Sequence, residues 1–190
     1  MKTLVPRMPL TGLLSLTKAQ FHAQYSPSLG YNNLTVGAII FKPSTANTHR
    51  LLLLKRAAHD HAFPGMFAIP GGHVEDTDLS IFHGLKREVL EETTMLVQGI
   101  IDQIDPLVWV TTRSVQKGES NSVTKSRSLQ ITFVCEVEGL AFQVDPEEHS
   151  MGIWADREEA EKVVMSTGMR RVVENAFKWK EAELQKGLKL

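Results

Sequence analysis

Short apolar runs separated by turn-forming segments mark the first part of the chain. The runs LTVGAIIF (34–41) and RLLLLKR (50–56) lie on either side of the polar KPSTANTH, a pattern that predicts two adjacent strands. The segment FPGMFAIPGGHVED (63–76) contains two prolines and three glycines, so it predicts a loop with a brief strand at 66–69.

A helical period replaces this pattern from about Ser80 to Thr93, where Phe82, Leu85 and Val89 recur on one face. A second helix is predicted at 167–184, where one side carries the apolar residues Met169, Val172, Val173, Ala176 and Phe177. Such a stripe on a helix favours packing against a core over contact with a membrane or partner.

Strand-like runs return at 96–104, 106–112 and 128–137, and a long polar loop is predicted from Arg113 to Ser126. In the last of these runs every second residue is apolar, as in a half-buried strand, which makes Cys135 a core residue. The run MGIWA (151–155) predicts one more short strand.

Strands and helices alternate too irregularly for a doubly wound sheet, and most neighbouring strands are close enough for hairpins. The pattern predicts an α+β fold, a layered α/β/α sandwich with a mixed sheet. The length of 190 residues predicts one domain over 1–190, with 1–33 as an N-terminal extension packed on it. PGGH lacks the spacing of a dinucleotide fingerprint or a P-loop.

The charges nearly cancel, with 21 basic and 22 acidic residues. This balance argues against a dedicated binder of nucleic acid polymers, so any phosphate site is local. A single cysteine fits a reducing compartment. No secretory signal and no run of about 20 apolar residues are recognised, so we expect a soluble, cytoplasmic protein without membrane contact.

The segment REVLEE contains the most informative charges. On a helix, Glu88, Glu91 and Glu92 fall within an arc of roughly 100° and can point at one volume. Their mutual repulsion requires a positive partner. One interpretation is a solvated helix face with Arg87 paired to Glu91; the other is a site for one or more divalent cations, which prefer oxygen ligands.

The preceding chain favours the cation. Lys55 and Arg56 end an apolar strand and are suited to phosphate oxygens, and Gly71 and Gly72 allow the backbone to approach a ligand closely. His73 beside them is a candidate for substrate contact. A basic strand end, a glycine loop and a carboxylate helix together suit metal-assisted attack on a phosphoanhydride.

These same segments resemble the Nudix hydrolases. Their signature is G-x5-E-x7-R-E-U-x-E-E-x-G-U, with U apolar, and GGHVEDTDLSIFHGLKREVLEETTM is similar to it, most closely in REVLEE. The resemblance implies that Arg87 braces the loop and helix and that Glu88, Glu91 and Glu92 bind Mg²⁺ or Mn²⁺. It also suggests Glu147 or Glu148, of which we select Glu148, as a distal catalytic carboxylate.

Two positions depart from the signature. Asp78 stands where the signature has glutamate, in a loop one residue longer, and we interpret it as the N-cap of the helix. Thr94 replaces the late glycine; a β-branched residue disfavours the left-handed conformation, so we expect a reshaped helix end.

Several residues keep two interpretations. The loop 113–126 either covers the non-phosphate half of the substrate or is a hairpin tip. Phe67, Trp109 and Trp154 are either core residues or stacking platforms for a base. His59 and His61 are interpreted as solvated, because no third ligand lies at suitable spacing.

The resemblance implies divalent-metal-dependent hydrolysis of a diphosphate linkage in a nucleotide-type or other small organic diphosphate. Two alternatives stay open: non-hydrolytic chemistry such as isomerisation or cyclisation on the same scaffold, and a regulatory module that binds a diphosphate ligand. The expected partner is the small-molecule substrate, and a homodimer is compatible with the sequence.

Overall fold

A mixed three-stranded sheet forms one part of the centre of the molecule. In the computed structural model, which describes residues 7–43, 49–60, 62–117 and 120–187, β1 (Asn33–Ile39) runs parallel to β6 (Ser120–Glu138). β6 is antiparallel to β5 (Leu96–Lys117), which gives the order β1-β6-β5. The predicted mixed sheet and α+β class are thereby confirmed.

A second, antiparallel sheet is built around β3 (His49–Arg56). This strand pairs with β2 (Phe41–Pro43) and β4 (Phe67–Ala68), and also with β7 (His149–Ala155). The predicted pairing of the runs 34–41 and 50–56 is therefore wrong for most of the first run. Its β1 portion joins the other sheet, since parallel pairing with β6 buries it on both faces.

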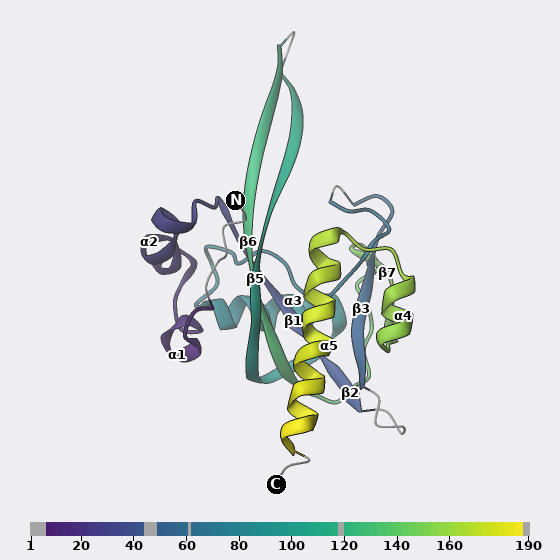
Figure 1. Cartoon of the computed structure of the whole chain (residues 1–190). Coiled ribbons are helices and arrows are strands. Elements are labelled where there is room, and N and C mark those ends of the chain that lie inside the picture. Colours follow the sequence, from purple (N-terminus) through teal and green to yellow (C-terminus); the bar gives the residue numbers. More distant parts are fainter. Residues whose placement is uncertain (1–6, 44–48, 61, 118–119, 188–190) are drawn as a thin grey trace.

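Helices cover both faces of the sheets (Figure 1). On one face lies α3 (Ile81–Thr93), and on the other lie α4 (Arg157–Lys162) and α5 (Thr167–Gly187). Near the N-terminus, α1 (Leu10–Leu13) and α2 (Lys18–Leu29) pack beside this sandwich. The two predicted helices, 80–93 and 167–184, are confirmed, whereas α1, α2 and α4 were not predicted.

The leucine run of β3 connects two apolar cores. Successive side chains of a strand point to opposite faces, so Leu52 and Leu54 join the core under α3, while Leu51 and Leu53 join the core under α5. N-terminal residues share the first of these cores, among them Leu13, Phe21 and Tyr31. Cys135 is buried in it, as predicted.

The polar segment predicted as a loop from Arg113 to Ser126 is instead a hairpin. β5 and β6 pair from Leu96 opposite Glu138 to Lys117 opposite Ser120, and the ribbon projects well beyond the rest of the molecule (Figure 1). A ladder of backbone hydrogen bonds needs no apolar side chains, so a polar sequence does not exclude strands. Within the described ranges no helix is long and apolar enough to cross a membrane.

Candidate metal and phosphate site

The helix α3 begins at Ser80. Its hydroxyl accepts a hydrogen bond from the His83 N–H at 3.1 Å, which makes Ser80 the N-cap. The prediction that Asp78 caps the helix is therefore wrong. Asp78 is buried two residues earlier and has other partners.

The helix ends at Thr94, which adopts the left-handed conformation with φ 60° and ψ 7°. Its N–H donates to the Leu90 carbonyl at 2.8 Å, and its hydroxyl accepts from the Gln143 N–H at 3.2 Å. These bonds offset the cost of the conformation for a β-branched residue. The expected reshaping of the helix end is wrong, because Thr94 takes the backbone conformation that a glycine would supply.

Arg87 links the helix to the preceding loop. Its guanidinium donates to both Asp78 oxygens at 3.0 and 2.9 Å and to the His73 carbonyl at 2.9 Å. It also donates to Glu88 at 3.0 Å and to Glu91 at 2.9 Å. One side chain thus fixes the loop and two of the predicted metal ligands.

The buried carboxylate of Asp78 is held in its charged form. Burial acts to raise its pKa, but hydrogen bonds from Arg87, the Glu75 N–H and His83 outweigh burial and lower the pKa to about 2. Arg87 and Asp78 therefore form an ion pair under the loop at neutral pH.

Glu88 and Gly72 approach each other closely. A Cβ at Gly72 would lie 2.3 Å from Oε2 of Glu88, so a larger residue here would push the Glu88 carboxylate from its position. Glu88 is mostly buried. Burial raises its pKa to about 7, although Arg87 acts in the opposite direction.

Glu92 lies deeper, with an exposed fraction of 3%. Its Oε2 accepts a hydrogen bond from the Gly71 N–H at 2.7 Å. Gly71 has φ 140°, and a Cβ there would lie 2.2 Å from the Val36 carbonyl. Burial, more than any other cause, raises the pKa of Glu92 well above its usual value, so a charged Glu92 calls for a cation.

A turn before β7 brings further ligand atoms to Glu92. Atoms of Glu92, Glu148 and His149 suited to metal binding all lie within 4.8 Å of one another. Two carboxylates and an imidazole are donors that divalent cations accept, and buried Glu92 lacks a cationic hydrogen-bond partner within the described ranges, so the residues fit a cation. His149 was not predicted; only its position next to Glu148 in the sequence could have indicated it.

Glu91 is placed differently from the other two helix carboxylates. Its side chain is 55% exposed and bonded to Arg87, and it is not part of the group with Glu148 and His149. Its role as a metal ligand stays a prediction.

A cavity of about 780 Å³ opens beside these carboxylates. Gly71 and His73 line it and contact the carboxylate helix, through Glu92 and Arg87 respectively, and Arg56 lines it as well. Its other walls combine polar and apolar side chains, among them Thr35, Ser126, Ser128, Gln130, Phe63, Phe67, Trp109 and Met169. A volume of this size is typical of sites for small organic molecules.

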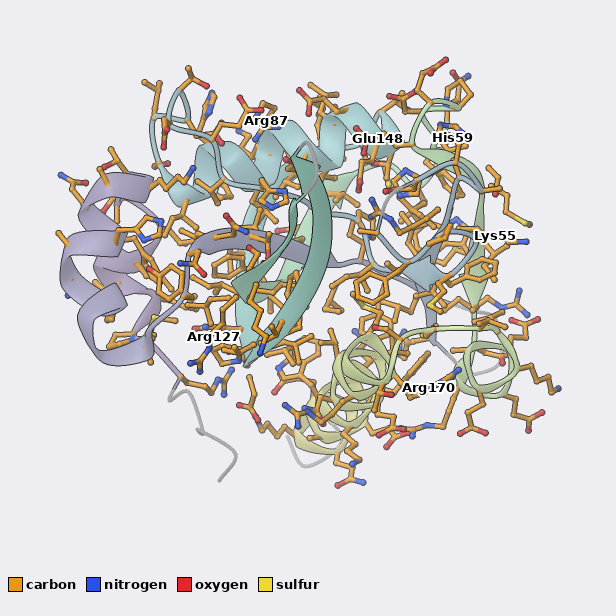
Figure 2. All side chains as sticks on the ribbon, turned by 90° about the horizontal axis from the view of Figure 1, so that it is seen from above. Lys55, His59, Arg87, Arg127, Glu148 and Arg170 are labelled. Carbon is orange, nitrogen blue, oxygen red and sulfur yellow. The ribbon has the colours of Figure 1, made fainter. Side chains whose placement is uncertain are left out.

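The two basic residues predicted to bind phosphate, Lys55 and Arg56, lie in different places. Arg56 lines the cavity and is paired with Asp60. Lys55 lies over the Phe67 ring at 6.0 Å from its centroid and does not line the cavity. Figure 2 shows Lys55 at the rim of the molecule, away from Arg87.

The three aromatic residues predicted as either core residues or stacking platforms also lie in different places. Phe67 and Trp109 line the cavity, whereas Trp154 packs against Phe142 and Lys42 outside it. His59 bonds the Glu147 carbonyl at 2.9 Å, and His61 lies outside the described residues. The base of the predicted loop lines the cavity through Ser126.

Comparisons with known proteins agree with this geometry. The family model described as NUDIX domain matches residues 32–176. The "Uncharacterized Nudix hydrolase NudL" of Enterobacter sp. (strain 638) is 43% identical over 63 residues, which are 32% of this chain and 33% of that protein. The match thus spans about a third of the length of this relative.

Two solved structures share the fold. The NUDIX domain of Shewanella oneidensis NrtR complexed with ADP ribose aligns with a TM-score of 0.58 at 20% identity, covering 86% of this chain and 98% of that one. NrtR from the same organism complexed with a 27mer DNA aligns with a TM-score of 0.51 at 18% identity, covering 80% and 63%. At such identities the likeness concerns the fold alone.

Because the family model matches well over half of the chain, the protein belongs to the Nudix family. This membership confirms the resemblance found in the sequence and supports hydrolase activity in general.

Proposed function

We propose that the protein hydrolyses a diphosphate linkage in a nucleotide-type or other small organic diphosphate and requires Mg²⁺ or Mn²⁺. The observation that carries this proposal is the contact between buried Glu92 and the Gly71 N–H at 2.7 Å, because Gly71 also lines the cavity. A substrate phosphate beside Gly71 would thus lie next to the carboxylates.

Glu92 and Glu148 would hold the cation, with Glu88 and Glu91 as the further predicted ligands. When bound, the cation neutralises phosphate charge and lowers the pKa of a coordinated water. Arg56 and His73 would orient the phosphates from the cavity wall.

The remaining catalytic roles belong to Arg87 and Glu88. Arg87 would hold the glycine loop against the helix through the His73 carbonyl and Asp78. As an alternative to its predicted role as a metal ligand, Glu88 is a candidate general base, because in the metal-free protein its pKa is about 7.

The test is product release from a panel of diphosphates. The panel contains nucleoside triphosphates, dinucleoside polyphosphates, nucleotide sugars and prenyl diphosphates, each measured with Mg²⁺, with Mn²⁺ and with chelator. We expect turnover that chelator abolishes and that Glu92→Gln reduces by at least about 10²-fold at unchanged folding. Turnover by Glu92→Gln at the level of the unaltered protein would contradict the proposal.

The second candidate is a binding module that recognises a diphosphate ligand without cleaving it. The structures with ADP ribose and with DNA favour it, because they show that proteins of this fold form such complexes. A rise in the thermal midpoint with ADP ribose, without product release, would support this candidate over hydrolysis.

A further inference from the structure

The turn that carries Glu148 and His149 is fixed to two other elements. The Asp145 carbonyl accepts from the N–H groups of Glu148 and His149 at 3.3 and 2.8 Å. The Ala57 N–H, just after β3, donates to the Glu148 carbonyl at 2.8 Å, and the Asp145 N–H donates to the Glu92 carbonyl at 3.4 Å. The backbone therefore holds the turn against the end of α3.

One of the two ring nitrogens of the buried His149 lacks a hydrogen-bond partner among the described residues. Its side chain is 1% exposed, and its Nδ1 has no partner in the part of the chain that the structure describes. Its Nε2 lies 3.6 Å from Oε1 of Glu92, which is too long for a hydrogen bond. Buried polar atoms normally have a partner, so a group from outside the chain is expected to bind this ring.

The distances suit one shared cation. Two ligands on a cation with bonds of about 2.1 Å are separated by about 3.0 Å when adjacent and by about 4.2 Å when opposite. The 3.6 Å from Nε2 of His149 to Oε1 of Glu92 lies between these values, and one ligand atom from each of Glu92, Glu148 and His149 lies within 4.8 Å of the others. Small side-chain rotations would bring them onto one ion.

We propose that His149 is a nitrogen ligand of the cation held by Glu92 and Glu148, so that this site binds Mn²⁺ in preference to Mg²⁺. Imidazole nitrogen suits transition metals, whereas Mg²⁺ prefers an all-oxygen shell. The inference rests on the proposed metal-dependent function only in placing the cation at Glu92 and Glu148.

The experiment is pulsed electron paramagnetic resonance of Mn²⁺ bound to the metal-free full chain, which detects directly bound ¹⁴N. We expect nitrogen coupling in the unaltered protein and in His49→Gln, a control at the start of β3, and none in His149→Gln. We also expect His149→Gln to weaken Mn²⁺ binding by at least about tenfold and Mg²⁺ binding by much less, as measured by calorimetric titration.

Absence of nitrogen coupling in the unaltered protein, or its persistence in His149→Gln, would overturn the proposal. If His149→Gln does not fold, the unaltered protein with ¹⁵N-labelled histidine replaces it: the coupling must change to that of ¹⁵N. Turnover of diphosphates without nitrogen coupling contradicts only the role of His149. Nitrogen coupling without turnover of any diphosphate contradicts only the hydrolysis.

Discussion

Asp78 and Arg87 meet through two parallel hydrogen bonds, Nε to Oδ1 at 3.0 Å and a terminal nitrogen to Oδ2 at 2.9 Å. Asp78 is 1% exposed in this pair. Because the two residues lie on either side of the Ser80 cap, the pair closes the loop onto the helix that carries the carboxylates.

Replacing Asp78 tests how much its pair with Arg87 contributes to the free energy of unfolding. We expect Asp78→Asn to lower the free energy of unfolding by about 3 kcal/mol, because it leaves a partly buried guanidinium with a poorer acceptor. Urea denaturation measures this change. The matched control is Asp76→Asn, whose carboxylate is 90% exposed and bonded to Lys18, and we expect it to cost less than about 0.5 kcal/mol. Equal effects would contradict this account.

The same pair makes stability depend on acid pH. The pKa of Asp78 is lowered to about 2 in the folded state, against about 3.9 in an unfolded chain. A lowered carboxyl pKa contributes stability that is complete above the unfolded value and is lost as the pH falls through the folded value. We expect the stability difference between the unaltered protein and Asp78→Asn to shrink by about 2 kcal/mol from pH 5 to pH 2. A difference that is constant over this range would contradict the lowered pKa.

The raised pKa of Glu88 predicts that the metal-free protein loses stability as the pH rises, the opposite of the effect of Asp78. Its pKa of about 7 exceeds that of an unfolded glutamate, so ionising it weakens the fold as the pH rises from about 4.3 to 7. We expect Glu88→Gln to be more stable than the unaltered protein by about 2–3 kcal/mol at pH 8 in chelator, and no more stable at pH 4. Denaturation curves at both pH values check this.

Adding a divalent cation should offset the destabilisation that ionised Glu88 causes at pH 8. We expect Mn²⁺ to raise the thermal midpoint of the unaltered protein at pH 8, because a bound ion stabilises the folded state by mass action. Glu92→Gln should show a smaller rise. Equal rises in both proteins would place the cation elsewhere.

Gly72 tests how closely the loop must approach the helix. We expect Gly72→Ala to reduce kcat by about 10²-fold, since its Cβ would displace Glu88 from its position. Gly99→Ala is the control: its Cβ would lie no nearer than 3.8 Å from another residue, so kcat should be unchanged. An active Gly72→Ala would show that Glu88 need not hold this position.

Substitutions of Arg56 and Lys55 test whether the substrate phosphates bind in the cavity or at the outer rim of the sheet. We expect Arg56→Ala to raise KM by about tenfold, because a charge-assisted hydrogen bond to phosphate is lost, and Lys55→Ala to have little effect, since Lys55 does not line the cavity. Steady-state kinetics on any diphosphate that is turned over checks both. The reverse order would place the phosphates on the Lys55 side.

Local patterns predicted the two long helices and the alternating strand at 128–137, because one buried face imposes a periodicity. They failed where tertiary contacts decide. Asp78 was misassigned because its partner Arg87 lies nine residues away, and Thr94 because its left-handed backbone depends on Gln143 from a distant loop. For the polar segment 113–126 a hairpin tip was one of two interpretations, but its strand pairing was not predicted, since a backbone ladder does not depend on apolar side chains.

In the candidate cation site, too, some residues can be predicted from local sequence patterns and others depend on tertiary contacts. The helical spacing of Glu88 and Glu92 is readable in the sequence, and both are buried beside the glycine loop. The position of His149 depends on a turn held by Glu92 and Ala57, two residues from other parts of the chain. No periodic pattern marks such a residue; its burial with an unpartnered Nδ1 among the described residues and its proximity to Glu92 and Glu148 identify it.

The four leucines of β3 have a consequence for folding fidelity. A slip of one residue would exchange Leu51 and Leu53 with Leu52 and Leu54, so three of the four buried positions would still receive leucine and the fourth would receive Arg50 or Lys55. The cost of burying that charged side chain acts against the shifted strand. The shift would also carry Arg56 to the opposite face of the sheet, out of the cavity and away from Asp60. The charged residues of this strand thus favour the correct register of β3. Arg56, which would bind phosphate, also helps to align the sheet.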